Sequence, residues 1–159
     1  MLRIGLSTDI HPLKVGRDMI LGGIFIDNDF GPDGHSDADV LTHAIAEAML
    51  GALALGDLGK HFPDTDPRYK GISSLLILKE VVRMIEERGW RLVNVDSMVL
   101  LEAPKLAIYN EAIRTSLAYV LHVTIDQVSV KATRGEKLGF IGRGEGIAAQ
   151  AVVLLEKAA

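Results

Sequence analysis

The stretch Gly34-His35-Ser36-Asp37-Ala38-Asp39-Val40-Leu41-Thr42-His43 places two histidines and two acids within ten residues. The pattern Ser36-x-x-Asp39 resembles a capping box, which predicts that a loop becomes a helix here. Gly56 marks the end of the expected helix. Its apolar stripe consists of Leu41, Ala44, Ala48, Ala52 and Leu55. These apolar positions predict a helix that packs on a core and holds polar side chains at its start.

Residues 2–11 alternate between apolar and polar side chains, which predicts a half-buried strand. We expect residues 20–26 to form a second strand, interrupted by Gly22-Gly23, and to pair with the first as a hairpin. Further helices are expected at 74–88 and 108–121, and further strands at 92–101 and 128–133. The tail, 147–155, fits helix by propensity and strand by its Val-Val-Leu-Leu run. The order predicts an α+β fold, with a mixed sheet of four or more strands and helices on one face, as a ferredoxin-like layer sandwich.

The composition narrows the classes of function. A length of 159 residues and 48% hydrophobic residues predict one domain, 1–159, with a sizeable core. A net charge of -4 and 5% aromatic residues argue against nucleic-acid binding. The absence of cysteine excludes disulfides and thiolate metal sites. No apolar run reaches membrane-spanning length and the N-terminus lacks a signal-peptide pattern, so we expect a cytoplasmic protein without a membrane partner.

Three side chains are candidate metal ligands. Asp9 and His11 are two residues apart on a predicted strand and therefore project from the same face. His43 lies one helix turn after Asp39. Together Asp9, His11 and His43 supply the two nitrogens and one oxygen typical of a catalytic zinc with an open position. Asp39 would support His43 or would simply favour the helix start through the dipole. The alternative is that the Asp-x-His pair is incidental and that His43 is an ordinary interior histidine.

The segment from Gly135 to Gly146 is rich in glycine and carries basic side chains, including Arg134 beside it and Arg143 within it. Glycines let backbone N–H groups approach an anion, and the basic side chains add positive charge. The segment matches neither the P-loop nor the dinucleotide-binding pattern. Glu136 and Glu145 are candidate Mg²⁺ ligands once phosphate is bound. The alternative is a flexible connection with solvated charges.

Five motifs, in order along nearly the whole chain, resemble the 2-C-methyl-D-erythritol 2,4-cyclodiphosphate synthase family. They are Asp9-x-His11, His35-Ser36-Asp37-x-Asp39, the segment Gly56–Pro67, Ala103-Pro104-Lys105 and the segment Glu136–Gly146. The resemblance implies that 4-diphosphocytidyl-2-C-methyl-D-erythritol 2-phosphate is cyclised with release of CMP, in the non-mevalonate route to isoprenoids. It also implies that the tail is a strand, and that the protein is a homotrimer with active sites between adjacent subunits.

The resemblance assigns roles residue by residue. Asp9, His11 and His43 match ligands of zinc or another divalent transition metal, and Glu136 matches a ligand of a second ion, Mg²⁺ or Mn²⁺. His35 matches a transition-state-stabilising residue. The residues that match contacts to the cytidyl-diphosphate substrate are Ser36, Asp57, Gly59, Phe62, Asp64, Asp66, Leu101, Ala103, Pro104, Lys105, Leu106, Ala107, Thr133, Phe140 and Arg143.

Two departures from the family pattern stand out. The family has threonine, then threonine or asparagine, where this chain has Arg134 and Gly135. Arg134 therefore takes the position of a transition-state threonine, and a guanidinium binds phosphate with a different geometry. Thr8 and Gln150 stand where an aromatic and an acid often line a cavity on the trimer axis. We therefore do not expect the isoprenoid diphosphate that some members hold there.

Two other functions fit the same residues. A metal-dependent phosphohydrolase would use the same ligands with water as the nucleophile. A non-catalytic, trimeric metabolite-binding protein would bind the substrate without turnover.

Overall fold

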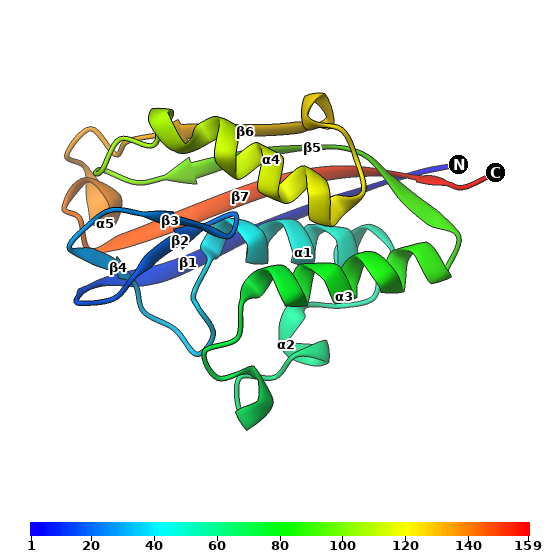
Figure 1. Ribbon diagram of the computed structural model, residues 1–159, viewed down its shortest axis with the longest axis horizontal. Helices are drawn as coiled ribbons and strands as arrows, with labels where there is room; N and C mark the ends of the chain where they lie inside the picture. The colour runs from blue at the N-terminus through cyan, green and yellow to red at the C-terminus, as the bar shows by residue number, and fades with distance from the viewer.

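The computed structural model describes residues 1–159, and its main sheet has five strands in the order β4-β1-β7-β5-β6 (Figure 1). The strands are β1 (Leu2–Val15), β4 (Phe30–Pro32), β5 (Trp90–Leu100), β6 (Val128–Thr133) and β7 (Gly146–Lys157). β7 runs antiparallel to both of its neighbours, and β5 runs parallel to β6. The sheet is therefore mixed, as expected, and the tail is a strand.

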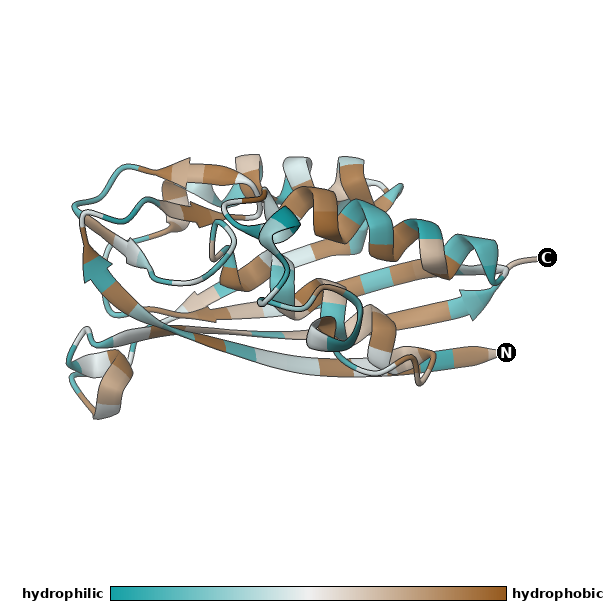
Figure 2. Ribbon diagram, turned by 90° about the horizontal axis from the view of Figure 1, so that it is seen from below, coloured by the Kyte–Doolittle hydropathy of each residue, from teal (hydrophilic) through white to brown (hydrophobic).

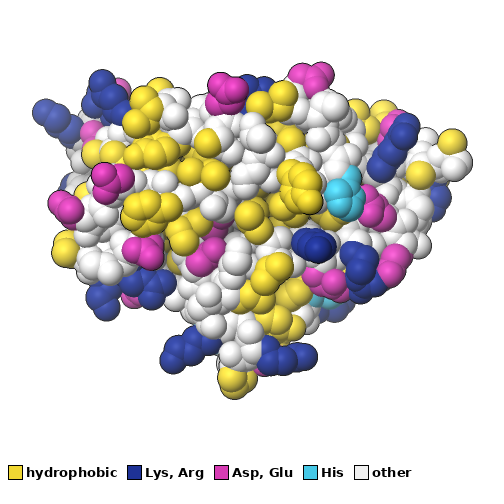
Figure 3. Space-filling model, in the orientation of Figure 1, with side chains coloured by type: hydrophobic (Ala, Val, Ile, Leu, Met, Phe, Trp, Pro, Cys, Tyr) yellow, Lys and Arg dark blue, Asp and Glu magenta, His cyan; other side chains and the backbone are white.

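Helices cover one face of this sheet, and Figure 2 shows the opposite face of the central strands without a helix over it. The helices over that face are α1 (Val40–Ala52), α3 (Ser74–Glu87) and α4 (Asn110–Leu121). Two short helices, α2 (Leu58–His61) and α5 (Gly139–Gly142), lie in the loops, together with 3₁₀ turns at Pro67–Tyr69, Ala107–Tyr109 and Ile125–Gln127. Seen from the helix side, charged side chains of both signs surround groups of hydrophobic ones (Figure 3). The α+β prediction is thus confirmed.

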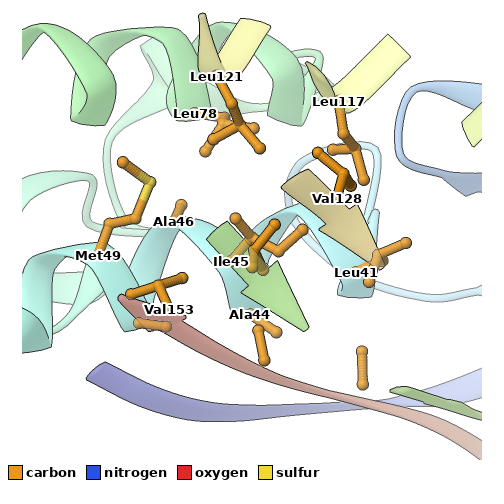
Figure 4. Close-up of a cluster of buried hydrophobic side chains, with 14 of the residues drawn as sticks. Leu41, Ala44, Ile45, Ala46, Met49, Leu78, Leu117, Leu121, Val128 and Val153 are labelled. Atoms are coloured by element: carbon orange, nitrogen blue, oxygen red, sulfur yellow. The ribbon is translucent and has the colours of Figure 1, made fainter. Parts of the chain in front are cut away.

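A hydrophobic core of 32 buried residues lies between the helices and the sheet. In Figure 4, Leu41, Ile45 and Met49 of α1 extend toward Leu78, Leu117 and Leu121 of α3 and α4. Val128 and Val153 contribute the sheet side of the same cluster. This packing fixes the start of α1, where His43 lies, against β1. No helix is long and apolar enough to cross a membrane.

The buried face of β1 is the opposite of the one its apolar pattern suggests. Gly5 and Ser7 are buried, whereas Ile4 and Leu6 are 71% and 69% exposed. Gly5 explains this orientation, since a Cβ there would lie 1.9 Å from the Ala48 carbonyl oxygen. Helix α1 therefore packs directly on the backbone of β1 at Gly5. The polar face of β1, with Asp9 and His11, turns toward the helices, and the apolar face stays uncovered.

Three expectations need correction. Residues 20–26 do not pair with β1, because β2 (Met19–Leu21) and β3 (Ile24–Ile26) turn back on each other at Gly22-Gly23. Helix α1 begins at Val40 with Asp39 as its N-cap, so Ser36 is not the cap. The order of the long strands and helices, β-α-α-β-α-β-β, also differs from the β-α-β-β-α-β order of the ferredoxin-like sandwich.

Candidate metal centre and substrate pocket

Strand β1 and helix α1 bring Asp9, His11 and His43 together. Asp9 Oδ2 lies 3.1 Å from His11 Nε2 and 3.2 Å from His43 Nδ1. One potential ligand atom from each residue lies within 4.8 Å of the other two, and all three residues are half-buried. The three side chains therefore converge on one point, as the spacing of Asp9 and His11 on a strand predicts.

The far nitrogen of each imidazole has its own partner. His11 Nδ1 lies 3.0 Å from the Asp33 carbonyl oxygen, which can only accept, so Nδ1 carries the proton. His43 Nε2 lies 2.7 Å from Ser74 Oγ and 3.2 Å from Ser36 Oγ. Such outer hydrogen bonds are the arrangement that holds metal-binding histidines in the correct tautomer. With two nitrogens and one carboxylate oxygen, the set fits a divalent metal with open positions.

The same contacts shift the pKa values of Asp9 and His11. Burial would raise the pKa of Asp9, but hydrogen bonds from His11 and His43 outweigh burial and lower that pKa to about 2. The Asp9 carboxylate, supported by the Asp33 carbonyl, raises the pKa of His11 above its usual range, against the opposing effect of burial. Asp9 is therefore a carboxylate throughout the neutral range.

Asp39 supports the fold and is not part of the Asp9–His11–His43 cluster. Its carboxylate is fully buried and accepts hydrogen bonds from the backbone N–H groups of Gly22, Gly23 and Thr42, and from Thr42 Oγ1. These donors tie the β2–β3 turn to the start of α1. The predicted support of His43 by Asp39 is thus wrong, while its alternative, a helix-start carboxylate, is confirmed.

A cavity of about 480 Å³ opens beside the three candidate ligands. It is lined by Asp9, His11, Gly34, His35, Ser36, His43, Glu47, Leu58, Gly59, Phe62, Pro63, Asp64, Tyr69 and Ile77. Eight of the predicted site residues are among them. Asp57 and Asp66 lie next to it: Asp57 caps α2, and the Asp66 carbonyl oxygen lies 3.2 Å from His35 Nε2.

The pocket wall formed by residues 57–66 is anchored to α1. Glu47 lies one helix turn after His43, and its Oε1 accepts a hydrogen bond from the Leu58 backbone N–H at 3.1 Å. Its Oε2 accepts a second from Ser7 Oγ on β1 at 2.6 Å. Glu47 therefore joins β1, α1 and the first residue of α2 at the edge of the pocket.

The remaining predicted residues gather elsewhere, around the ends of β5 and β6. The Leu101 backbone N–H donates to the Thr133 carbonyl oxygen, and the Gly135 N–H donates to Glu102 Oε2 at 2.8 Å. These bonds join the 101–107 and 133–143 segments to each other. None of the predicted residues in the two segments lines the 480 Å³ cavity. One chain thus holds two separate groups of predicted site residues.

The two residues that depart from the family pattern lie at the start of the glycine-rich segment. The Arg134 side chain is 55% exposed, and its closest charged partner is Glu136 Oε1, at 3.8 Å from Nη2. Gly135 lies against backbone, since a Cβ there would be 2.6 Å from the Gly142 nitrogen. The loop is closed too tightly at this point for a larger residue in the same conformation.

Sequence reasoning missed Glu47 and Ser74, and gave Asp37 no role. Glu47 had a usable signal, since it follows His43 by four residues and so shares its helix face. Ser74 had none, because it lies 31 residues from His43 and its sequence context indicates only a helix cap. Only the packing of α3 against α1 reveals that contact.

Comparisons with known proteins place the whole chain in one family. A model of the YgbB family matches residues 2–156. The 2-C-methyl-D-erythritol 2,4-cyclodiphosphate synthase of Chloroherpeton thalassium is 57% identical over 156 residues, covering 98% of this chain and 99% of the relative. A solved structure of a synthase of that name in its CDP-bound form is similar with a TM-score of 0.90 at 37% identity, covering 97% of this chain and 100% of that one. The Plasmodium falciparum IspF CDP complex has a TM-score of 0.88 at 33% identity, covering 99% and 97%.

Proposed function

The chain belongs to the YgbB family, and we propose that it catalyses the reaction after which its curated relatives are named, the synthesis of 2-C-methyl-D-erythritol 2,4-cyclodiphosphate. In this lyase reaction 4-diphosphocytidyl-2-C-methyl-D-erythritol 2-phosphate is cyclised and CMP is released, as a step of non-mevalonate isoprenoid biosynthesis. The observation that carries the proposal is the Asp9–His11–His43 cluster beside a cavity, in a chain that matches such synthases over nearly its full length.

Asp9, His11 and His43 would hold zinc or another divalent transition metal, and Glu136 would contribute one carboxylate to a second ion, Mg²⁺ or Mn²⁺. When bound, these ions supply positive charge to the diphosphate oxygens. The chain positions the donors: β1 and α1 fix the three ligands, and the hydrogen bonds behind the imidazoles fix their tautomers.

The bond changes are those of an intramolecular phosphoryl transfer. An oxygen of the 2-phosphate attacks the β-phosphorus, and the bond from that phosphorus to the bridging oxygen breaks, so that CMP leaves with the electron pair. A phosphomonoester has a second pKa near 6, so the attacking group is mostly dianionic at neutral pH and needs no strong base. The protein is left with positioning and charge neutralisation.

The pocket residues divide these tasks. His35 and Ser36 lie at the cavity wall, where they would donate hydrogen bonds to phosphate oxygens. His35 directs Nε2 at the Asp66 carbonyl, which leaves Nδ1 for a ligand. Asp57, Gly59 and the segment from Phe62 to Asp66 would hold the methylerythritol folded and limit the access of water.

The cytidyl group would bind at the second group of residues. The backbone of Leu101 to Ala107, with Thr133 and Phe140, would hold the cytidine, and Arg143 would contact the diphosphate. A hollow of about 390 Å³ at this edge is lined by Leu106, Ala107, Asn110, Ile113, Val130 and Ala132. Arg134, at the position of the family threonine, would offer a guanidinium to the phosphates.

The separation of the two groups supports a homotrimer in which each active site combines residues from adjacent subunits. The uncovered face of β1 supplies the apolar surface that assembly would bury, since Leu2, Ile4, Leu6 and Ile10 are each more than half exposed. A contiguous apolar surface of this kind is typical of an interface. The chain, with its one core, would act as one domain in that assembly.

The test is a product assay with the purified protein, the diphosphocytidyl substrate, Zn²⁺ and Mg²⁺, followed by ³¹P NMR. The cyclic diphosphate and CMP in equal amounts are expected, and His43→Ala should abolish both. His122→Ala, which removes an exposed histidine paired with Glu86, serves as the matched control with parent activity. An opened phosphate as product would indicate a phosphohydrolase, and binding without turnover would indicate a non-catalytic protein.

A further inference from the structure

A hydrogen-bond chain that passes through the buried Ser74 lies behind His43, on the side away from Asp9. Ser74 Oγ lies 2.7 Å from His43 Nε2 and donates its own proton to Asp37 Oδ1. The Ser74 backbone N–H donates to Asp37 Oδ2 at 3.0 Å. Ser74 is fully buried, so water cannot replace it as a partner of the imidazole. Asp37, Ser74 and His43 thus form an ordered row that ends at the three-residue cluster.

The donor directions along this row follow from its carboxylate end. A carboxylate only accepts, so the Ser74 hydroxyl must donate to Asp37. The Ser74 oxygen is then left as an acceptor for a proton on His43 Nε2. A neutral imidazole with its proton on Nε2 has its lone pair on Nδ1, the atom that faces Asp9 at 3.2 Å.

We propose that Ser74 and Asp37 are positioning residues for the metal site, which fix His43 in the Nε2–H tautomer and so present Nδ1 to the ion. The proposal rests on the proposed function only in taking Asp9, His11 and His43 as the ligands. It extends the site from strand β1 and helix α1 to the first residue of α3.

Ser36 does not offer an equal alternative. Its Oγ lies farther from His43 Nε2, at 3.2 Å, and already accepts a hydrogen bond from the Ala38 N–H. Ser36 is half-buried and lines the cavity, where a substrate would compete for its hydroxyl. Ser74 has no such exposure, and its orientation is fixed at two points by one carboxylate.

Backbone hydrogen bonds outside the Asp37–Ser74–His43 row also hold it in place. The Asp37 backbone N–H donates to the Ile72 carbonyl, and the Gly71 N–H donates to the His35 carbonyl. These bonds join the 34–37 segment to the residues that lead into α3. Asp37 and Ser74 are therefore held in register independently of the contact with His43, as a positioning function requires.

The experiment compares zinc affinity and the state of the His43 ring in Ser74→Ala and in a matched control, Ser97→Ala. Ser97 is equally buried, lies on β5 and donates only to the Ser129 carbonyl. Loss of an outer partner typically weakens metal binding about 10–100-fold, and we expect a loss in that range for Ser74→Ala alone. Zinc dissociation constants come from competition with a chelating dye. ¹⁵N NMR of the zinc-loaded proteins is expected to show a slowly exchanging proton on His43 Nε2 in the parent and rapid exchange of that proton in Ser74→Ala.

A second variant guards against misfolding. Asp37→Asn keeps the size of the side chain but cannot accept from both the Ser74 hydroxyl and the Ser74 N–H, so a smaller loss of zinc affinity is expected. Unchanged zinc affinity together with unchanged exchange of the His43 Nε2 proton, in folded Ser74→Ala or folded Asp37→Asn, would overturn the proposal. A parent protein that binds no zinc would overturn it together with the metal site. A parent that binds zinc with a slowly exchanging His43 Nε2 proton but forms no cyclic product would leave this proposal standing and refute the proposed reaction.

Discussion

The Glu47 carboxylate accepts a hydrogen bond from the Leu58 backbone N–H at 3.1 Å and thereby ties helix α1 to the wall of the 480 Å³ cavity. The second oxygen of the same carboxylate accepts from Ser7 Oγ at 2.6 Å. Glu47 is half-buried between these partners. The wall formed by residues 57–66 therefore depends on a side chain from the helix that carries His43, a proposed metal ligand.

Glu47→Ala should loosen this wall while leaving the three proposed metal ligands, Asp9, His11 and His43, in place. Two donors lose a charged partner, which is expected to cost about 2 kcal/mol of folding stability. KM for the substrate should rise, with zinc affinity close to that of the parent. Glu47→Gln is the matched control, because its amide can accept from Leu58 and donate to Ser7. Steady-state kinetics and urea unfolding provide the measurements, and equal KM values for Glu47→Ala and the parent would contradict this anchoring role.

The Asp9–His11 pair should give the pH–stability profile of the metal-free protein two limbs. Its free energy of unfolding should fall at low pH because of Asp9 and at high pH because of His11. The pKa of Asp9 falls from 3.8 to about 2 on folding, so its contribution is present above pH 3.8 and is lost as the pH falls through 2. This difference corresponds to about 2 kcal/mol. The pKa of His11 is raised from 6.5, so its contribution is present below pH 6.5 and is lost as the pH rises through the folded value.

Urea unfolding in the presence of a chelator, from pH 2 to pH 9, measures both limbs. Asp9→Asn removes the carboxylate that raises the pKa of His11, so both limbs of the stability profile should flatten in that variant. Asp29→Asn is a suitable control, since the Asp29 side chain is exposed, makes no hydrogen bond or ion pair, and lies outside the Asp9–His11–His43 cluster. A pH profile of Asp9→Asn that retained both limbs of the parent would show that other groups cause them.

Local patterns were sufficient for much of the fold but not for the assembly of the site. The predicted strand at 128–133 has the observed bounds, and the helix expected at 74–88 is α3, Ser74–Glu87. The alternation in β1 correctly placed Asp9 with His11, but it could not show which face α1 covers. That choice depends on the close contact of Gly5 with Ala48, 43 residues away. The Ser74–His43 contact likewise arises only when α3 packs on α1.

Gly135→Ala should disrupt the glycine-rich segment without unfolding the protein. The added Cβ would meet backbone atoms at 2.6 Å and 2.9 Å, from Gly142 and Leu138, so the loop must move. The side chains of Arg134 and Glu136 on either side would move with it. We expect about 10-fold or greater loss of kcat/KM, because small displacements at a reacting site have large effects. Zinc binding at Asp9 and a near-parent melting temperature should persist.

Gly144→Ala provides a comparison within the same segment, since a Cβ added there would have no atom within 4 Å but the φ of +70° disfavours a side chain. Gly135→Ala therefore tests the effect of a steric clash, and Gly144→Ala tests the effect of backbone strain. If Gly135→Ala kept the parent kcat/KM, the tight packing of Gly135 on Gly142 would have no part in catalysis.

Leu6→Glu should separate the subunits of the proposed trimer. Leu6 is 69% exposed on the uncovered face of β1, opposite Val152 of β7. A carboxylate buried in an apolar interface without a partner is strongly unfavourable, whereas the same residue is well solvated in a monomer. Tyr119→Glu is the matched control, because Tyr119 is 85% exposed but lies on α4, on the helix side. Sedimentation velocity should show a monomer for Leu6→Glu and a trimer for the control.

The catalytic consequence distinguishes a shared site from one contained in a single chain. Asp9, His11 and His43 come from one chain, so the Leu6→Glu monomer should bind zinc with parent affinity. The residues proposed to bind cytidine lie outside the 480 Å³ cavity, so cyclisation should be lost together with the trimer. A monomeric variant that formed the cyclic diphosphate at the parent rate would show that the 101–107 and 133–143 segments of the same chain complete the site.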